Sequence, residues 1–111
     1  MNQELEREVN QLHAEFCAGL ADPKRILILY ALSEGPLNVT ELTTNLGMSQ
    51  PAVSRHLKVL RDRGMVAATR FGPAVEYRLA DGRLIEALDL LRAALRDHLA
   101  HRAELAGIFE E

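Results

Sequence analysis

The chain has 111 residues, 48% hydrophobic and 26% charged, with a formal net charge of −3 and one cysteine. These proportions are typical of a globular protein, so we expect one domain over residues 1–111. No membrane partner is expected, because no apolar run approaches the ~20 residues of a membrane helix. One cysteine excludes an internal disulfide, and the polar, acidic start lacks the features of a secretory signal, which favours a cytoplasmic location.

The charged residues are unevenly distributed along the chain. The segment 48–78 has a net charge of +4, whereas the rest of the chain has a net charge of −7. The six basic residues of this segment are Arg55, Lys58, Arg61, Arg63, Arg70 and Arg78. A basic segment between acidic ends is typical of a protein with one surface facing a polyphosphate, although chance clustering of solvated charges gives the same pattern.

Two helices are predicted in the first third of the chain. Residues 1–20 place apolar side chains at helical spacing, namely Leu5, Val9, Leu12, Phe16 and Leu20. Asp22 followed by Pro23 is typical of a helix start, because Asp caps the first turn and Pro fits the first helical position. The helix that follows, KRILILYALSE, is apolar on almost every side, which indicates burial, and Gly35 with Pro36 ends it.

Residues 40–63 are predicted to form a helix-turn-helix. Thr40 is the predicted N-cap of a short helix that ends at Gly47, and Ser49 is the predicted N-cap of the helix that follows. The tight, glycine-containing turn between the two helices is typical of this motif. The preceding stretch, residues 37–39, is too short to predict more than a linker or a strand at the edge of a sheet.

The periodicity changes after the helix-turn-helix. Residues 65–79 contain two β-rich runs, MVAATRF and AVEYRL, joined by Gly72 and Pro73, which predicts a two-stranded hairpin. Asp81 then caps a long helix over residues 82–108, about 40 Å in length. The predicted fold is mainly α (α+β): a winged helix-turn-helix with about five helices, in which the hairpin is the wing.

The second helix of the helix-turn-helix, within SQPAVSRHLKVLRDRG, is amphipathic. Val53, Leu57 and Leu60 share one face that we expect to pack inward, with His56 at its margin. The opposite face carries Gln50, Ser54, Arg55, Lys58, Arg61 and Asp62. The helix therefore has one structural face and one polar face that needs a separate explanation.

The chemistry of this polar face matches DNA recognition. In a helix that enters the major groove, Gln50 can pair with adenine, Arg55 with guanine, and Ser54 can donate or accept a hydrogen bond. Lys58 and Arg61 fit contacts with phosphates. The alternatives are an ordinary solvated helix face or a winged-helix module that binds a protein instead of DNA. An enzyme is not expected, because no phosphate loop, nucleophile elbow or complete metal site is present.

The order of motifs over residues 21–79 resembles the ArsR/SmtB-type winged helix-turn-helix transcriptional repressors. The matching residues are Asp22-Pro23-x-Arg25, Val39-x-Glu41-Leu42, Ser49-Gln50, Ser54-x-His56-Leu57-x-x-Leu60, Gly64-Met65-Val66 and Tyr77-Arg78-Leu79. The resemblance implies a homodimer that binds double-stranded operator DNA and, in many relatives, is released by a metal or another effector. Repression is implied by the resemblance alone, and the effector is unknown.

The resemblance also implies which residues contact DNA. They lie at the start of the second helix of the helix-turn-helix and in the wing: Ser49, Gln50, Pro51, Ser54, Arg55, His56 and Arg70. Wings of the family often carry several basic residues at the tip, whereas here Arg70 is followed by Phe71-Gly72-Pro73-Ala74. We therefore expect weak wing contact, limited to phosphates.

The last helix predicts a dimer interface. A seam with alternating spacings of four and three follows it, through Leu84, Leu88, Leu91, Leu95, His98, Arg102 and Leu105. A partner's helices can cover such a stripe, and the first helix, within residues 1–20, supplies a second one. The expected interface residues are Leu5, Leu12, Phe16, Leu88, Leu91, Leu95 and His98. The alternative is that the last helix folds over its own core.

The resemblance implies two kinds of metal site, and neither is complete. Asn38 and Thr40 stand where some relatives carry a Cys-x-Cys pair, and these residues do not bind a soft metal. On the last helix, His101 and Glu104 match the second half of a ligand set whose first half is missing. A divalent ion needs about four ligands, so we expect no required cofactor.

Two sensor alternatives remain open. His13 and Cys17 on the first helix could meet a polar group of the last helix at the dimer interface and bind zinc. The residues of that group are Asp97, His98, His101 and Glu104. Alternatively, Cys17 could respond to oxidants through an intersubunit disulfide or a sulfenic acid. The competing interpretation is that Cys17 is a small buried hydrophobic residue.

Overall fold

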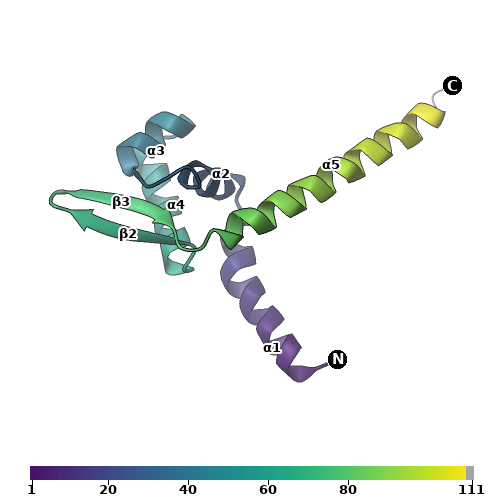
Figure 1. Cartoon of the computed structure of the whole chain (residues 1–111), viewed down its shortest axis with the longest axis horizontal. Helices are drawn as coiled ribbons and strands as arrows, with labels where there is room; N and C mark the ends of the chain where they lie inside the picture. The colour runs from purple at the N-terminus through teal and green to yellow at the C-terminus, as the bar shows by residue number, and fades with distance from the viewer. Residues whose placement is uncertain (110–111) are drawn as a thin grey trace.

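The computed structural model describes the backbone of residues 1–109 and the side chains of residues 1–107. Its α-helices are α1 (Gln3–Leu12), α2 (Pro23–Leu32), α3 (Val39–Leu46), α4 (Gln50–Asp62) and α5 (Arg83–Phe109), and the π-helical segment η1 (His13–Cys17) continues α1. Its strands are β1 (Leu37–Asn38), β2 (Val66–Phe71) and β3 (Ala74–Leu79). Over these described residues, the five α-helices and the hairpin confirm the predicted winged helix-turn-helix (Figure 1).

Side-chain caps fix three of the helix starts where the sequence predicts them. The carboxylate of Asp22 accepts a hydrogen bond from the Lys24 N–H at 2.9 Å and begins α2. The Ser49 hydroxyl accepts from the Ala52 N–H at 3.3 Å at the start of α4. Asp81 accepts from the backbone N–H two residues later, at 2.9 Å, before α5. Each cap satisfies an N–H that has no partner inside its helix.

The predicted cap of α3 was wrong by two residues. The N-cap is Asn38, whose side chain accepts from the Glu41 N–H, while the Glu41 carboxylate accepts from the Asn38 N–H. This reciprocal arrangement needs an acidic or amide side chain three positions after the cap. Glu41 stands three positions after Asn38, whereas no such residue stands three positions after Thr40. Thr40 is therefore an exposed residue within the first turn of α3.

The hairpin belongs to a sheet with strand order β1-β3-β2 in the described part of the chain. In the hairpin, Val66 pairs with Leu79 at the base and Phe71 pairs with Ala74 at the tip. The two strands are joined through Gly72, whose φ of +61° suits glycine. β1 pairs antiparallel with β3, so the short stretch before α3 is an edge strand and not a linker.

The core lies between the helix-turn-helix, α2 and the base of the wing. Its buried residues are Ile28, Leu29, Leu32, Leu42, Val53, Leu57, Leu60, Met65, Val66 and Leu88. Helix α5 contributes only its first turns to this core, because Leu88 is the last core residue among its described side chains. The remaining length of α5 therefore needs another source of stability.

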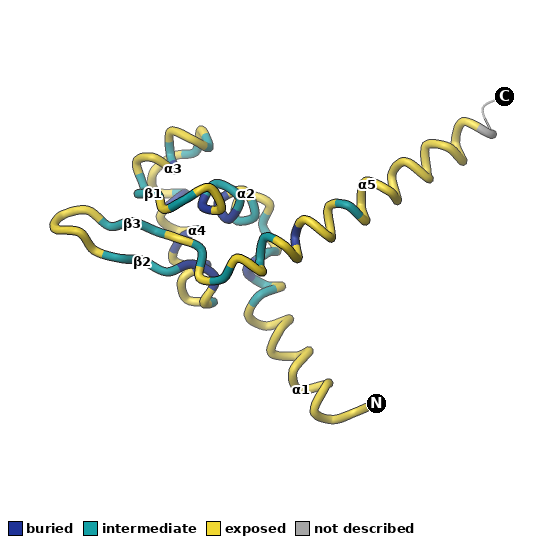
Figure 2. Tube along the Cα trace, in the orientation of Figure 1, coloured by how far each residue is buried: buried dark blue, intermediate teal, exposed yellow. Residues whose placement is uncertain are grey.

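The N-terminal helix and α5 project from the body of the protein in different directions (Figure 1). The radius of gyration is 17.6 Å, whereas a compact chain of this length has about 13 Å. Figure 2 shows both projecting helices exposed along most of their length. None of the described helices is both long and apolar enough to cross a membrane.

Candidate nucleic-acid interface

Helix α4 is held in the core by one face and exposes the opposite face. Val53, Leu57 and Leu60 are at most 1% exposed, which anchors the helix against α2 and α3. Gly47, with φ +64°, ends α3 and turns the chain into α4. The exposed polar residues at the start and along the outer face of α4 are Ser49, Gln50, Ser54, Arg55, Lys58 and Arg61.

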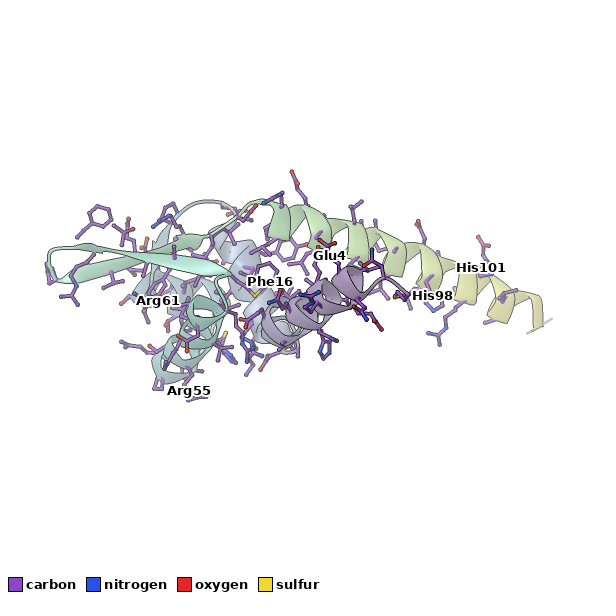
Figure 3. All side chains as sticks on the ribbon, turned by 90° about the horizontal axis from the view of Figure 1, so that it is seen from below. Glu4, Phe16, Arg55, Arg61, His98 and His101 are labelled. Carbon is purple, nitrogen blue, oxygen red and sulfur yellow. The ribbon has the colours of Figure 1, made fainter. Side chains whose placement is uncertain are left out.

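The exposed face of α4 lies opposite its buried face and carries both charged and uncharged polar side chains. Arg55 lies at the outer edge of the molecule (Figure 3), and neither Arg55 nor Arg61 forms an ion pair with a described residue. Gln50 and Pro51 occupy the first turn of the helix and are exposed. Together these groups provide donors, acceptors and positive charge on one surface.

Lys58 forms an ion pair with Asp62 at 3.0 Å, one helical turn away. The two side chains are 77% and 61% exposed, so the pair contributes little to stability. A weak, solvated pair of this kind can open without a large cost. Lys58 is therefore available to a phosphate, although Asp62 offsets part of its charge.

His56 is oriented differently from the other predicted contact residues. Its side chain is only 13% exposed and lies 3.9 Å from the Asp22 carboxylate and 3.5 Å from the Arg25 guanidinium. Burial lowers the pKa of His56, an effect that Asp22 opposes and Arg25 reinforces. This position disfavours direct contact with DNA and favours a role in joining α4 to the start of α2.

The wing has an apolar base and a tip with little charge. Arg70 is exposed near the tip and pairs with Val75 across the hairpin. Phe71 is 59% exposed, and the turn through Pro73 adds no charge. Arg78 is turned back to the Thr69 hydroxyl at 2.5 Å. The tip therefore offers one exposed arginine, and weak contact by the wing stays a prediction.

Apolar residues remain uncovered along both projecting helices. On the N-terminal helix, Leu5 is 45% and Leu12 is 51% exposed, while Phe16 is half-buried against the core. On α5, Leu91 and Leu95 are exposed, with His98 further along the same helix (Figure 3). These positions suit the predicted dimer interface.

Leu88 is placed differently from the other predicted interface residues. It is 6% exposed and belongs to the core of its own protomer, because the first turns of α5 pack against the body. The change from buried Leu88 to exposed Leu91 marks where α5 leaves the core. The interpretation that the last helix folds over its own core is therefore confirmed for its first turns, and the dimer interface stays a prediction for the exposed remainder.

The candidate metal ligands do not meet within one protomer. Among the described residues, no group of three or more His, Cys, Asp or Glu side chains is arranged to hold a metal ion. His13 is exposed on η1, whereas His98 and His101 lie on the outer part of α5 (Figure 3). Cys17 is exposed, so its interpretation as a buried hydrophobic residue was wrong.

Arg25 and Arg63 join the N-terminal helix to the body, a role that the sequence pattern does not indicate for either residue. Arg25 donates from Nε to the Gly19 carbonyl at 2.7 Å and from Nη2 to the Ala18 carbonyl at 3.2 Å. Arg63, at the end of α4, donates to the Ala14 carbonyl. The Arg63 contact links residues 49 positions apart, and no local pattern predicts it.

The comparisons with known proteins agree with this geometry. The family model described as "Bacterial regulatory protein, arsR family" matches residues 22–68, from the start of α2 into β2. The chain is similar to the HTH-type transcriptional regulator NmtR of Mycobacterium tuberculosis, at 46% identity over 63% of this chain and 58% of that protein. The chain thus spans just under three fifths of the length of this relative.

Two further similarities extend over more of the chain. The protein named "Probable mercury resistance operon repressor" of Streptomyces lividans is 37% identical over 78% of this chain and 70% of its own length. The solution structure of a homodimeric winged helix-turn-helix DNA-binding domain from Mycobacterium bovis superposes with a TM-score of 0.76 at 28% identity. That superposition covers 91% of this chain and 93% of the other.

Proposed function

The chain belongs to the arsR family of bacterial regulatory proteins, and on this premise we propose that it represses transcription by binding operator DNA as a homodimer. The observation that carries the proposal is the outer face of α4. The buried residues of α4 fix the helix in the core. Its exposed residues are of the types that recognise bases and phosphates. The proposed site of action is the bacterial cytoplasm.

The proposed contacts follow from the position of each residue on α4. Gln50, Ser54 and Arg55 lie in the first half of the helix, which reaches base edges when such a helix enters the major groove. Lys58 and Arg61 lie further along and suit phosphates. Arg70 adds a phosphate contact from the wing. His56 supports these residues by holding α4 against α2.

The local charge supports a polyphosphate partner. The segment 48–78, which covers α4 and the wing, has a net charge of +4 in a chain of net charge −3. An acidic remainder repels DNA, so binding is limited to the surface that carries the basic residues. The same distribution argues against the alternative, a winged-helix module that binds another protein and no DNA.

The proposed dimer pairs the projecting helices of two protomers. Leu91 and Leu95 are 64% and 54% exposed, and apolar stripes of this length are rarely left in water. A second copy provides matching stripes from its own N-terminal helix and α5. Twofold symmetry then presents two α4 helices to successive major grooves, about 34 Å apart.

Binding to DNA selected by the protein from a random duplex library tests the proposal. We expect saturable binding by fluorescence anisotropy, with log Kd rising linearly with log salt and about 0.9 in the slope for each phosphate neutralised. The matched control is a scrambled duplex of equal length. Equal affinity for both duplexes, or no salt dependence, contradicts the proposal and favours the protein-binding alternative.

A further inference from the structure

The N-terminal helix changes its hydrogen-bond pattern just before it meets the body. In the π-helical segment His13–Cys17, the Ala18 N–H donates to the His13 carbonyl. In an α-helix this N–H would donate to Ala14, four residues back. The Ala14 carbonyl therefore does not receive the hydrogen bond from the Ala18 N–H that it would accept in a regular α-helix. Such a carbonyl is free to accept a donor from another element.

That donor comes from the end of α4. Arg63, the C-cap residue of α4, donates from Nη1 to the Ala14 carbonyl. A guanidinium donor carries a full charge, so this hydrogen bond is stronger than one between neutral groups. It connects the helix of the proposed dimer interface directly to the helix of the proposed DNA interface.

The contact is supported by close packing at Gly19. This glycine is buried, and a Cβ built on it would lie 2.6 Å from the Met65 sulfur and 3.8 Å from Arg63 Cγ. The end of the N-terminal helix thus rests on the residues that follow α4, with no space for a methyl group. The Arg63 stem is part of that surface, which limits the positions of its guanidinium.

A second arginine reinforces the same junction from α2. Arg25 donates to the Gly19 and Ala18 carbonyls, which end the N-terminal helix. Its guanidinium also lies 3.5 Å from His56 Nδ1 on α4. The N-terminal helix is therefore held against α4 directly through Arg63 and indirectly through Arg25.

We propose that Arg63 is a positioning residue for DNA binding, which sets the direction of α4 relative to the N-terminal helix. This inference rests on the proposed homodimer, in which that direction decides the distance between the two α4 helices. A dimer can engage two half-sites at once only when this distance matches their separation. Arg63 thus controls which half-site spacing the protein accepts, without contacting DNA.

The test compares duplexes that differ only in spacing. The probes carry the inverted half-sites selected from a random library by the wild-type protein, with the spacer unchanged, shortened or lengthened by one or two base pairs, and a single half-site. The proteins are wild type, Arg63→Ala, Arg63→Lys and Arg61→Ala. Sedimentation and thermal unfolding of each variant establish that the dimer is intact and folded.

We expect Arg63→Ala to weaken binding to the selected spacing about tenfold, the lower end of the size of one lost charged hydrogen bond, and to flatten the dependence on spacing. Its affinity for the single half-site stays within about twofold of wild type. Arg63→Lys, which keeps a charged donor, restores most of the spacing preference. Arg61→Ala, which removes a proposed phosphate contact, weakens binding to every paired duplex by the same factor, whatever its spacing, and keeps the preference.

A uniform loss for Arg63→Ala, with an unchanged spacing profile, overturns the inference, because it indicates that Arg63 acts only through its charge. If Arg63→Ala does not fold, a wild-type profile for Arg63→Lys supports the inference and a uniform loss contradicts it. If wild type itself binds paired and single half-sites equally, the proposed dimeric mode fails, and the role of Arg63 fails with it.

Discussion

The side chains of Asn38 and Glu41 bond each other's backbone N–H groups, at 2.8 Å and 3.0 Å. Asn38 also pairs with Glu76 in the sheet, so one residue ends β1, begins α3 and adjoins β3. This junction fixes the first helix of the helix-turn-helix against the middle of β3 in the wing. The orientation of α4 depends on it, because α3 and α4 pack together.

We therefore predict that Asn38→Ala lowers the free energy of unfolding by about 1 kcal/mol. The Glu41 N–H loses its acceptor, and the Glu41 carboxylate is no longer held against the N–H of residue 38. Thr40→Ala is the matched control and changes stability by less than about 0.5 kcal/mol, because Thr40 is exposed and is not the cap. Urea denaturation followed by circular dichroism measures both. A larger effect at Thr40 than at Asn38 contradicts this assignment of the cap.

Arg55 and Arg70, two of the exposed arginines of the proposed DNA surface, are predicted to differ in importance. Arg55→Ala abolishes specific binding, because it removes a bidentate base contact from the helix in the major groove. Arg70→Ala weakens binding only a few-fold, since one phosphate contact from the wing is lost. Titration of each variant against the selected duplex and its scrambled control separates loss of specificity from loss of charge. Equal losses in the two variants refute this ranking.

Two leucines one turn apart on α5 are predicted to have different roles. Leu91→Asp yields a folded monomer in sedimentation experiments, because Leu91 is 64% exposed and belongs to the surface that a second copy covers in the proposed dimer. Leu88→Ala is the matched comparison and lowers the free energy of unfolding by about 2–5 kcal/mol, because it leaves a cavity in the core. A Leu91→Asp protein that remains dimeric at micromolar concentration contradicts the proposed interface.

His56 makes stability depend on pH. Burial lowers the pKa of His56 in the folded protein below its usual value of 6.5. As the pH falls below 6.5, the unfolded chain binds a proton at this position before the folded protein does. The stabilising effect of neutral His56 is therefore present above this pH and is lost as the pH falls.

Denaturation with urea over a pH series measures this dependence. We expect wild type to lose more stability than His56→Gln between about pH 7 and the folded-state pKa, because glutamine does not titrate. Parallel slopes for wild type and His56→Gln are incompatible with a neutral, buried His56.

Features that depend on neighbours in the sequence could be predicted from the sequence alone. Asp22 and Ser49 cap helices within three residues, so their patterns were sufficient to locate α2 and α4. The change of period after α4 similarly predicted the hairpin. Asn38 and Thr40 are both of residue types common at N-caps, so the residue type alone does not separate them. Only the bond with Glu41 identifies Asn38 as the cap.

The order of the helices, the wing and the polar face of α4 were thus determined by the sequence itself, because capping and periodicity act over a few residues. Only the tertiary structure decided that His56 turns toward Asp22 and that Leu88 is buried while Leu91 is exposed. It also decided that Arg63 reaches Ala14, a residue 49 positions away. Such contacts depend on where distant segments meet in space, and that is a property of the packed core.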